Sequence, residues 1–106
     1  MNGPLLETRT VSRKTPRDGR LEITRPTALR LQQTVGDGEM ALDLDGIVGV
    51  ARLDTYECTC RGPDERHVHY FLQSDLFRGL VPESRVDLAW LSVDGGGRLR
   101  AQTQTG

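Results

Sequence analysis

Apolar and polar residues alternate in several short stretches after residue 20, and this is the period of a half-buried β-strand. Stretches with this alternation, or with a β-branched and aromatic composition, are 21–24, 28–34, 39–45, 46–53, 55–61, 67–73, 85–93 and 98–104. Ser74 can cap one short helical turn, which Gly79 would end. Because the strands recur about every 8–12 residues, the pattern predicts a small closed β-barrel or sandwich.

The first two long stretches are predicted to form a hairpin that precedes the barrel. They flank Val35-Gly-Asp-Gly38, which is a turn sequence. A four-residue loop would place Leu31 opposite Leu42 on one face and Arg30 opposite Asp43 on the other. Apolar pairs on one side and an opposite-charge pair on the other agree with each other, so they favour this register.

The first 19 residues lack a sustained apolar period and contain Pro4 and Pro16 among small polar and basic residues. We expect a mobile arm or a weak edge strand with few ladder hydrogen bonds. The predicted organisation is therefore a flexible basic arm, residues 1–19, followed by a single β-barrel domain, residues 20–106.

Length and composition fit one small domain. The chain has 106 residues, of which 36% are apolar and 5% aromatic, so its core must be compact and mostly aliphatic. It has no apolar run of about 18 residues and no cationic start followed by an apolar stretch. We therefore expect a cytoplasmic protein that does not associate with a membrane.

Charge is unevenly distributed along the chain, although the net charge is only −1. Residues 1–33 carry seven basic and three acidic side chains, for a net charge of +4. Residues 34–60 carry one basic and six acidic side chains, for a net charge of −5. A basic arm of this kind either contacts nucleic acid or is simply a solvated tail.

Two cysteines and two histidines flank the predicted turn at 62–66. If Cys60 pairs with His67, then Cys58 faces His69 and all four side chains lie on one face of a hairpin, at a spacing that can roughly supply a tetrahedral zinc site. A register one residue different would send both histidines to the opposite face. Without zinc, no cofactor is expected. The two cysteines, separated by one residue along a strand, are poorly placed to form a disulfide with each other.

The same residues could in principle form a cysteine–histidine nucleophile. Such catalysis also needs a group that orients the histidine and donors for an oxyanion, and the sequence signals neither. It also contains no phosphate-binding loop, dinucleotide fingerprint or metalloprotease helix. We therefore predict that the protein is not an enzyme.

Residues 46–104 resemble an OB-fold, and in detail a cold-shock domain. Arg66-His-Val-His-Tyr70 stands where that family has Val-Phe-Val-His-Phe, and Phe77-Arg-Gly-Leu80, Gly95-Gly-Gly97 and Arg100-Ala-Gln102 echo its later stretches. The resemblance implies a base-stacking surface, whose positions would be Tyr56, Cys58, His67, His69 and Tyr70. The sequence departs from the family at Gly49-Val-Ala-Arg52, in place of Lys-Trp-Phe-Asn, and at Asp54-Thr-Tyr-Glu-Cys58, in place of Lys-Gly-Phe-Gly-Phe. The added carboxylates weaken the attraction for phosphate.

These observations predict a mainly β protein, an OB-like barrel with an extra N-terminal hairpin and a flexible arm. Its expected function is that of a small binding module for single-stranded nucleic acid. The residues assigned to that function are Tyr56, His67, His69 and Tyr70 in the sheet and Arg13, Lys14 and Arg17 in the arm. A protein-interaction or scaffold domain is one alternative. A hairpin with a structural zinc on Cys58, Cys60, His67 and His69 is the other.

Overall fold

The structure is a computed structural model that describes residues 5–35, 38–58, 67–93 and 96–104. Its elements, in chain order, are β1 (Leu5–Thr10), α1 (Lys14–Asp18), β2 (Arg20–Ile23), α2 (Arg25–Val35), β3 (Glu39–Leu44), β4 (Ile47–Cys58), β5 (His67–Gln73), the 3₁₀ helix η1 (Asp75–Gly79), β6 (Arg85–Val93) and β7 (Gly96–Thr103). The predicted mainly β fold is confirmed. No helix in the described ranges is long and apolar enough to cross a membrane.

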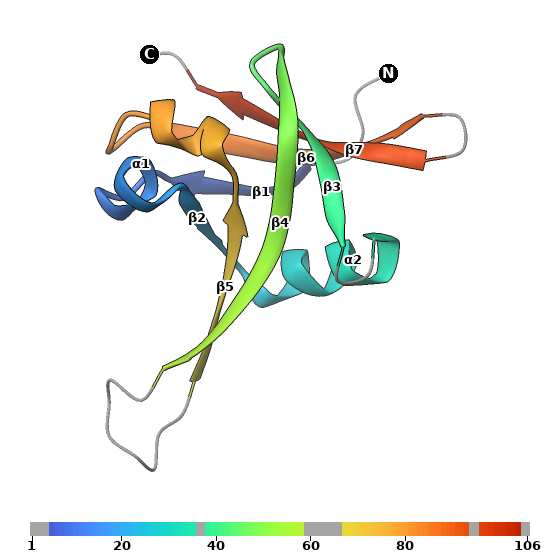
Figure 1. Cartoon of the computed structure of the whole chain (residues 1–106), viewed down its shortest axis with the longest axis horizontal. Helices are drawn as coiled ribbons and strands as arrows, with labels where there is room; N and C mark the ends of the chain where they lie inside the picture. The colour runs from blue at the N-terminus through green and yellow to red at the C-terminus, as the bar shows by residue number, and fades with distance from the viewer. Residues whose placement is uncertain (1–4, 36–37, 59–66, 94–95, 105–106) are drawn as a thin grey trace.

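The strands form one sheet that curls almost into a closed barrel (Figure 1). Their order is β1-β6-β7-β3-β4-β5-β2, and β3 with β7 is a parallel pair whereas the other neighbours are antiparallel. The two edge strands, β1 and β2, meet at a seam. There Glu7 Oε1 accepts hydrogen bonds from the backbone N–H and the hydroxyl of Thr24, both at 2.9 Å. Side chains thus connect the edges where backbone pairing stops.

The inside of the barrel is aliphatic, as the composition predicts. Alternate strand residues point inward and are fully buried, among them Leu21, Leu42, Leu72, Leu88 and Leu99. Phe77, from η1, is also fully buried. Because these side chains come from β2, β3, β5, β6, β7 and η1, one core holds the whole barrel together.

The predicted N-terminal hairpin is wrong, because residues 25–35 form helix α2 instead of a strand. Thr27, Ala28 and Leu31 are buried at helical spacing, whereas Leu29 is exposed. The helix begins with Pro26 in its first turn, where proline is tolerated, and continues with good helix formers.

The strand that was expected to pair with this segment finds other partners. β3 pairs with β4 and β7. Asp43 therefore lies opposite Val48, not Arg30, and Leu42 lies opposite Gly49, not Leu31.

The predicted mobile arm is also wrong over the described part of residues 1–19. Residues 5–10 form β1, which pairs with β6 as an edge strand, and residues 14–18 form α1. Val11 and Thr15 are buried. The alternative prediction, a weak edge strand, is therefore confirmed for residues 5–10. The polar composition of β1 fits a strand that is paired on one side only.

The predicted strands 46–53 and 55–61 form one continuous strand, β4, which ends at Cys58. Asp54 does not break it, because its side chain points outward and forms an ion pair with Arg52 at 3.3 Å. The resemblance to a cold-shock domain implied five strands in residues 46–104. The described part of this range contains four, β4, β5, β6 and β7.

Candidate functional site

The β4–β5 hairpin is longer than the strands beside it, so its outer part projects from the barrel (Figure 1). β3 pairs with β4 only as far as Arg52, and β2 pairs with β5 only between Tyr70 and Gln73. Beyond these positions β4 and β5 pair with each other alone, up to Cys58 opposite His67. One end of the hairpin therefore belongs to the barrel, and the other carries side chains that no neighbouring strand covers.

The register of this hairpin differs by two residues from the predicted one. Cys58, not Cys60, pairs with His67, and Tyr56, not Cys58, pairs with His69. Because the difference is an even number, His69 keeps the face that was predicted for it and shares that face with Tyr56.

The predicted zinc ligands fall mostly outside what the structure describes. Cys60 lies outside the described residues, and only the backbone of Cys58 and His67 is described. His69 is placed beside Glu22 and opposite Tyr56. Among the described residues, no three histidine, cysteine or acidic side chains gather in a way that could hold a metal ion.

A hollow of about 440 Å³, the first hollow, lies where α1 meets the outer face of β2, β5 and β4. It is lined by Ser12, Lys14, Arg17, Asp18, Arg20, Glu22, Tyr56, His69 and Phe71. Four of the predicted nucleic-acid-binding residues, Lys14, Arg17, Tyr56 and His69, are thus brought together. Arg13 is exposed just before α1 and does not line the hollow.

Helix α1 is held against the barrel by bonds at its C-terminal end. Gly19, with φ of 70°, ends the helix in the left-handed conformation that glycine adopts most easily. Its carbonyl accepts a hydrogen bond from the N–H of Ser74 at 2.9 Å, and Arg78 Nη1 donates to the carbonyl of Arg17 at 2.9 Å. These contacts to η1 and to the residue before it place the cations of α1 beside the sheet.

The floor of the first hollow is a row of stacked side chains. The rings of His69 and Phe71 have centroids 6.1 Å apart at an interplanar angle of 30°. The guanidinium carbon of Arg20 lies 5.8 Å from the centroid of Phe71, which allows a cation–π interaction. Tyr56, directly across from His69, is 57% exposed. The hollow therefore presents aromatic surface to solvent.

Two pairs of polar side chains in the lining of the first hollow are hydrogen-bonded. His69 Nδ1 and Glu22 Oε2 lie 2.7 Å apart, with side chains 30% and 45% exposed. Arg17 Nε and Nη2 donate to the two oxygens of Asp18 at 3.1 and 3.2 Å. The hydrogen bonds from Arg17 lower the pKa of Asp18, and those to Asp18 raise the pKa of Arg17.

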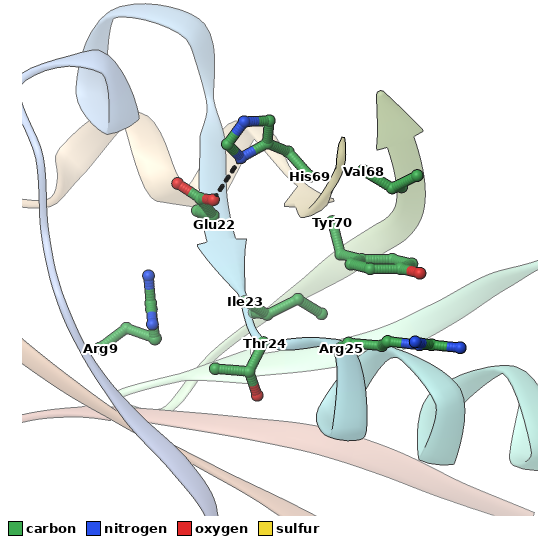
Figure 2. Close-up of a pocket in the computed structure, with 8 residues that line it drawn as sticks. All are labelled: Arg9, Glu22, Ile23, Thr24, Arg25, Val68, His69 and Tyr70. Atoms are coloured by element: carbon green, nitrogen blue, oxygen red, sulfur yellow. Dashed lines mark hydrogen bonds and ion pairs between the residues drawn. The ribbon is translucent and has the colours of Figure 1, made fainter. Parts of the chain in front are cut away.

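A second hollow, of about 640 Å³, lies at the seam of the barrel, where β2 ends and β5 continues (Figure 2). Its lining consists of Arg9, Glu22, Ile23, Thr24, Arg25, Val68, His69 and Tyr70. Figure 2 shows His69 pointing toward Glu22 and Tyr70 pointing away from that pair, on the side of Arg25. Tyr70, another predicted site residue, therefore belongs to this hollow and not to the first.

Sequence reasoning missed Glu22 and Phe71 as lining residues, and it counted Arg9, Arg20 and Arg25 only among the cations of a basic arm. Alternation could have found Arg20 and Glu22, since they are the polar positions between the inward-facing Leu21 and Ile23. Phe71 is two positions from His69 on the same strand and could have been found in the same way. Arg9 and Arg25 become neighbours only when the barrel curls.

The lining of the two hollows is basic. It includes five basic side chains, Arg9, Lys14, Arg17, Arg20 and Arg25, against two acidic ones, Asp18 and Glu22. The whole protein, by contrast, has a net charge of −1. The cations are thus concentrated where the exposed aromatic side chains are.

No protein-family model matches the chain, and no curated protein matches it.

Proposed function

We propose that this protein is a binding module for single-stranded nucleic acid, and that the first hollow receives the strand. One observation supports this most directly: an exposed tyrosine and a partly exposed histidine line the same hollow as cations that come from a different part of the chain. Tyr56 and His69 come from the hairpin, and Lys14 and Arg17 come from α1.

The two kinds of side chain serve the two parts of a nucleotide. A base can stack on the Tyr56 and His69 rings, which is worth ~1–3 kcal/mol per base and depends little on sequence. Lys14, Arg17 and Arg20 can attract the phosphates and release counterions from the strand. The proposed activity is binding without catalysis.

A single strand fits this surface better than a duplex. Stacking on a protein side chain requires an exposed base face, and the bases of a duplex are stacked on each other. The hollow is also a short concave surface on the flank of a barrel.

The test is a titration of a fluorescein-labelled ten-nucleotide oligothymidylate, followed by anisotropy over a range of salt concentrations. We expect the wild-type affinity to fall as salt rises. Lys14→Gln should reduce the slope of log K against log salt by about 0.7, the value for one phosphate contact on a single strand. Arg30→Gln, an exposed cation on α2 outside both hollows, is the matched control and should leave the slope unchanged. Absence of binding at tens of micromolar protein in low salt would contradict the proposal.

A second candidate function, protein interaction, has a separate observation in its favour. Val48 and Val50, in the barrel half of β4, share one face of the strand, are 63% and 53% exposed and form an apolar strip, and Ile47, at the start of the strand, is 61% exposed. This candidate predicts no salt-dependent oligonucleotide binding, and a charged substitution such as Val50→Asp would then weaken association with the partner protein.

A further inference from the structure

We infer that the second hollow is a second nucleotide subsite for the same ligand, so that a bound strand runs from the first hollow past Glu22 and His69 into the seam of the barrel. This inference rests on the proposed function. It adds that the ligand is a strand of several nucleotides and not a single nucleotide.

The two hollows are adjacent and share two lining residues, Glu22 and His69. Both of these side chains are partly exposed, so they form a low boundary and not a buried wall. Because β2 ends at Ile23, opposite Tyr70, and the chain then turns into α2, β2 does not cover the edge of β5 on the far side of Tyr70. A nucleic-acid strand on the outer face of β5 can therefore pass around this edge, beyond the end of β2, to Val68 and Tyr70 on the other face of β5.

The second hollow repeats the chemistry of the first with different residues. Tyr70 supplies an aromatic ring that is half-buried and packs against the core, and the half-exposed Val68 adds apolar surface beside it. Arg25, at the start of α2, is exposed. Figure 2 shows Arg9 and Arg25 on opposite sides of the hollow. The second hollow thus offers an aromatic ring to a base and two guanidinium groups to a phosphate, which are the same kinds of partner as in the first hollow.

Arg9 has donor capacity that the protein does not use fully. Its Nε lies 3.5 Å from Glu7 Oε2, which is an ion-pair distance. Within the described structure, this buried Nε forms no hydrogen bond. The Arg9 side chain as a whole is 32% exposed, so its terminal nitrogens, and not the buried Nε, can donate charge-assisted hydrogen bonds to a phosphate oxygen in the hollow.

The volumes and charges of the two hollows also suit a nucleic-acid strand that passes from one hollow to the other. Hollows of roughly 300–1,000 Å³ accommodate small ligands, so volumes of about 440 and 640 Å³ each suit a nucleotide-sized group. The Glu22 carboxylate between them repels phosphate. The phosphates should therefore lie on Lys14, Arg17 and Arg20 on one side and on Arg9 and Arg25 on the other, and a sugar or base should pass over the hydrogen-bonded Glu22 and His69.

The experiment compares ligand length with the position of the mutated cation. Unlabelled oligothymidylates of two, four and ten nucleotides compete with the labelled ten-nucleotide strand for the wild type, Lys14→Gln, Arg25→Gln and the control Arg30→Gln, which lies on the same helix as Arg25. The wild type should bind the longer strands more tightly than the dinucleotide. Arg25→Gln should weaken the longer strands by about tenfold and the dinucleotide much less. Lys14→Gln should weaken all lengths, and Arg30→Gln should change none.

The results separate the inference from the proposal on which it rests. If the wild type binds oligothymidylate but Arg25→Gln behaves like Arg30→Gln at every length, the second subsite is wrong and the first stands. If Arg25→Gln weakens the dinucleotide and the long strands equally, the order of the two hollows along the ligand is wrong. If no length binds the wild type, the proposed function itself fails. Equal thermal melting of all variants checks that each is folded.

Discussion

The two halves of the β4–β5 hairpin have the same alternation of side chains but different surroundings. In the barrel half, Ala51, Leu53 and Leu72 are buried because β3 and β2 lie beside them. In the projecting half, Val68, which has the same phase of alternation as Leu72, is 47% exposed because neither neighbour reaches that far, and Tyr56 lies on the outer face and is 57% exposed. On the inner face of the hairpin, the ends of β2 and β3 therefore determine where the core stops and the surface begins.

This difference separates stability from binding within one pair of strands. Residues in the barrel half contribute buried apolar area, which holds the fold together. Residues in the projecting half contribute little to the core and are available to a ligand. Substitutions in the two halves should therefore have different consequences, and the predictions below test this separation.

The largest effect is expected in the barrel half. Leu72→Ala removes a fully buried side chain on β5 and leaves a cavity, so it should reduce the free energy of unfolding by ~2–5 kcal/mol. Urea denaturation followed by circular dichroism measures this change. A loss below about 1 kcal/mol would mean that this half is not packed as described.

Tyr56→Ala in the projecting half should weaken oligonucleotide binding and leave the stability of the fold almost unchanged. The ring is mostly exposed, so the free energy of unfolding should change by no more than about 0.5 kcal/mol. Oligonucleotide affinity should fall by ~1–3 kcal/mol with little change in salt slope, because stacking releases no counterions. His69→Ala should behave similarly in the same titration. A large loss of stability in Tyr56→Ala would break the separation between the two halves.

Gly19→Ala tests how α1 is held beside the hairpin. The residue has φ of +70°, and an added Cβ would lie 3.1 Å from the carbonyl oxygen of Ser74. The left-handed conformation costs an alanine roughly 1–2 kcal/mol. We expect that loss of stability in thermal or urea unfolding, together with weaker oligonucleotide binding because Lys14 and Arg17 shift. Unchanged affinity would show that the position of α1 does not matter for the ligand.

The smallest effect concerns the Arg17–Asp18 pair. Arg17 lowers the pKa of Asp18, so any stabilisation from this exposed pair is present above the usual pKa of an aspartate and is lost as the pH falls through the lowered value. Because Asp18 competes with phosphate for Arg17, Asp18→Asn should raise oligonucleotide affinity a few-fold at neutral pH. It should also abolish any gain in affinity that the wild type shows when this carboxylate is protonated. Titrations at neutral and acidic pH measure both effects, and weaker binding by Asp18→Asn would contradict the competition.

The sequence predicts the later strands closely. The predicted stretches 39–45, 67–73, 85–93 and 98–104 correspond to β3, β5, β6 and β7, which differ from them by at most two residues at either end. These strands face the core on one side only, so their alternation is clear.

In the N-terminal third, the predicted strand 21–24 corresponds to β2, but residues 1–19 and 28–34 were misread for a physical reason. In α2, Leu29 and Leu31 alternate with polar residues as they would in a strand, and the helical spacing of the buried Thr27, Ala28 and Leu31 includes a threonine that does not register as apolar. In β1, an edge position leaves the side chains only partly buried, so the pattern is weak. Local pattern alone does not resolve such cases, because neighbours in the fold decide them.

The candidate site was predictable only where it follows local alternation. Tyr56 and His69 share a face by periodicity and are found on one face. The proximity of Lys14 and Arg17 to them was not a sequence prediction, because it depends on the left-handed turn at Gly19 and the bonds from α1 to η1. The second hollow depends on the meeting of β1 and β2, which local alternation does not predict.

The most direct test of the central claim is to locate the ligand on the protein by NMR. An ¹⁵N-labelled sample is titrated with unlabelled ten-nucleotide oligothymidylate, and amide shift changes are mapped on the structure. The account predicts that the largest changes fall within residues 12–25, 54–56 and 68–71, around the two hollows, with little change at Ile47, Val48 and Val50. Changes concentrated on that apolar strip, or no changes at saturating oligonucleotide, would contradict it.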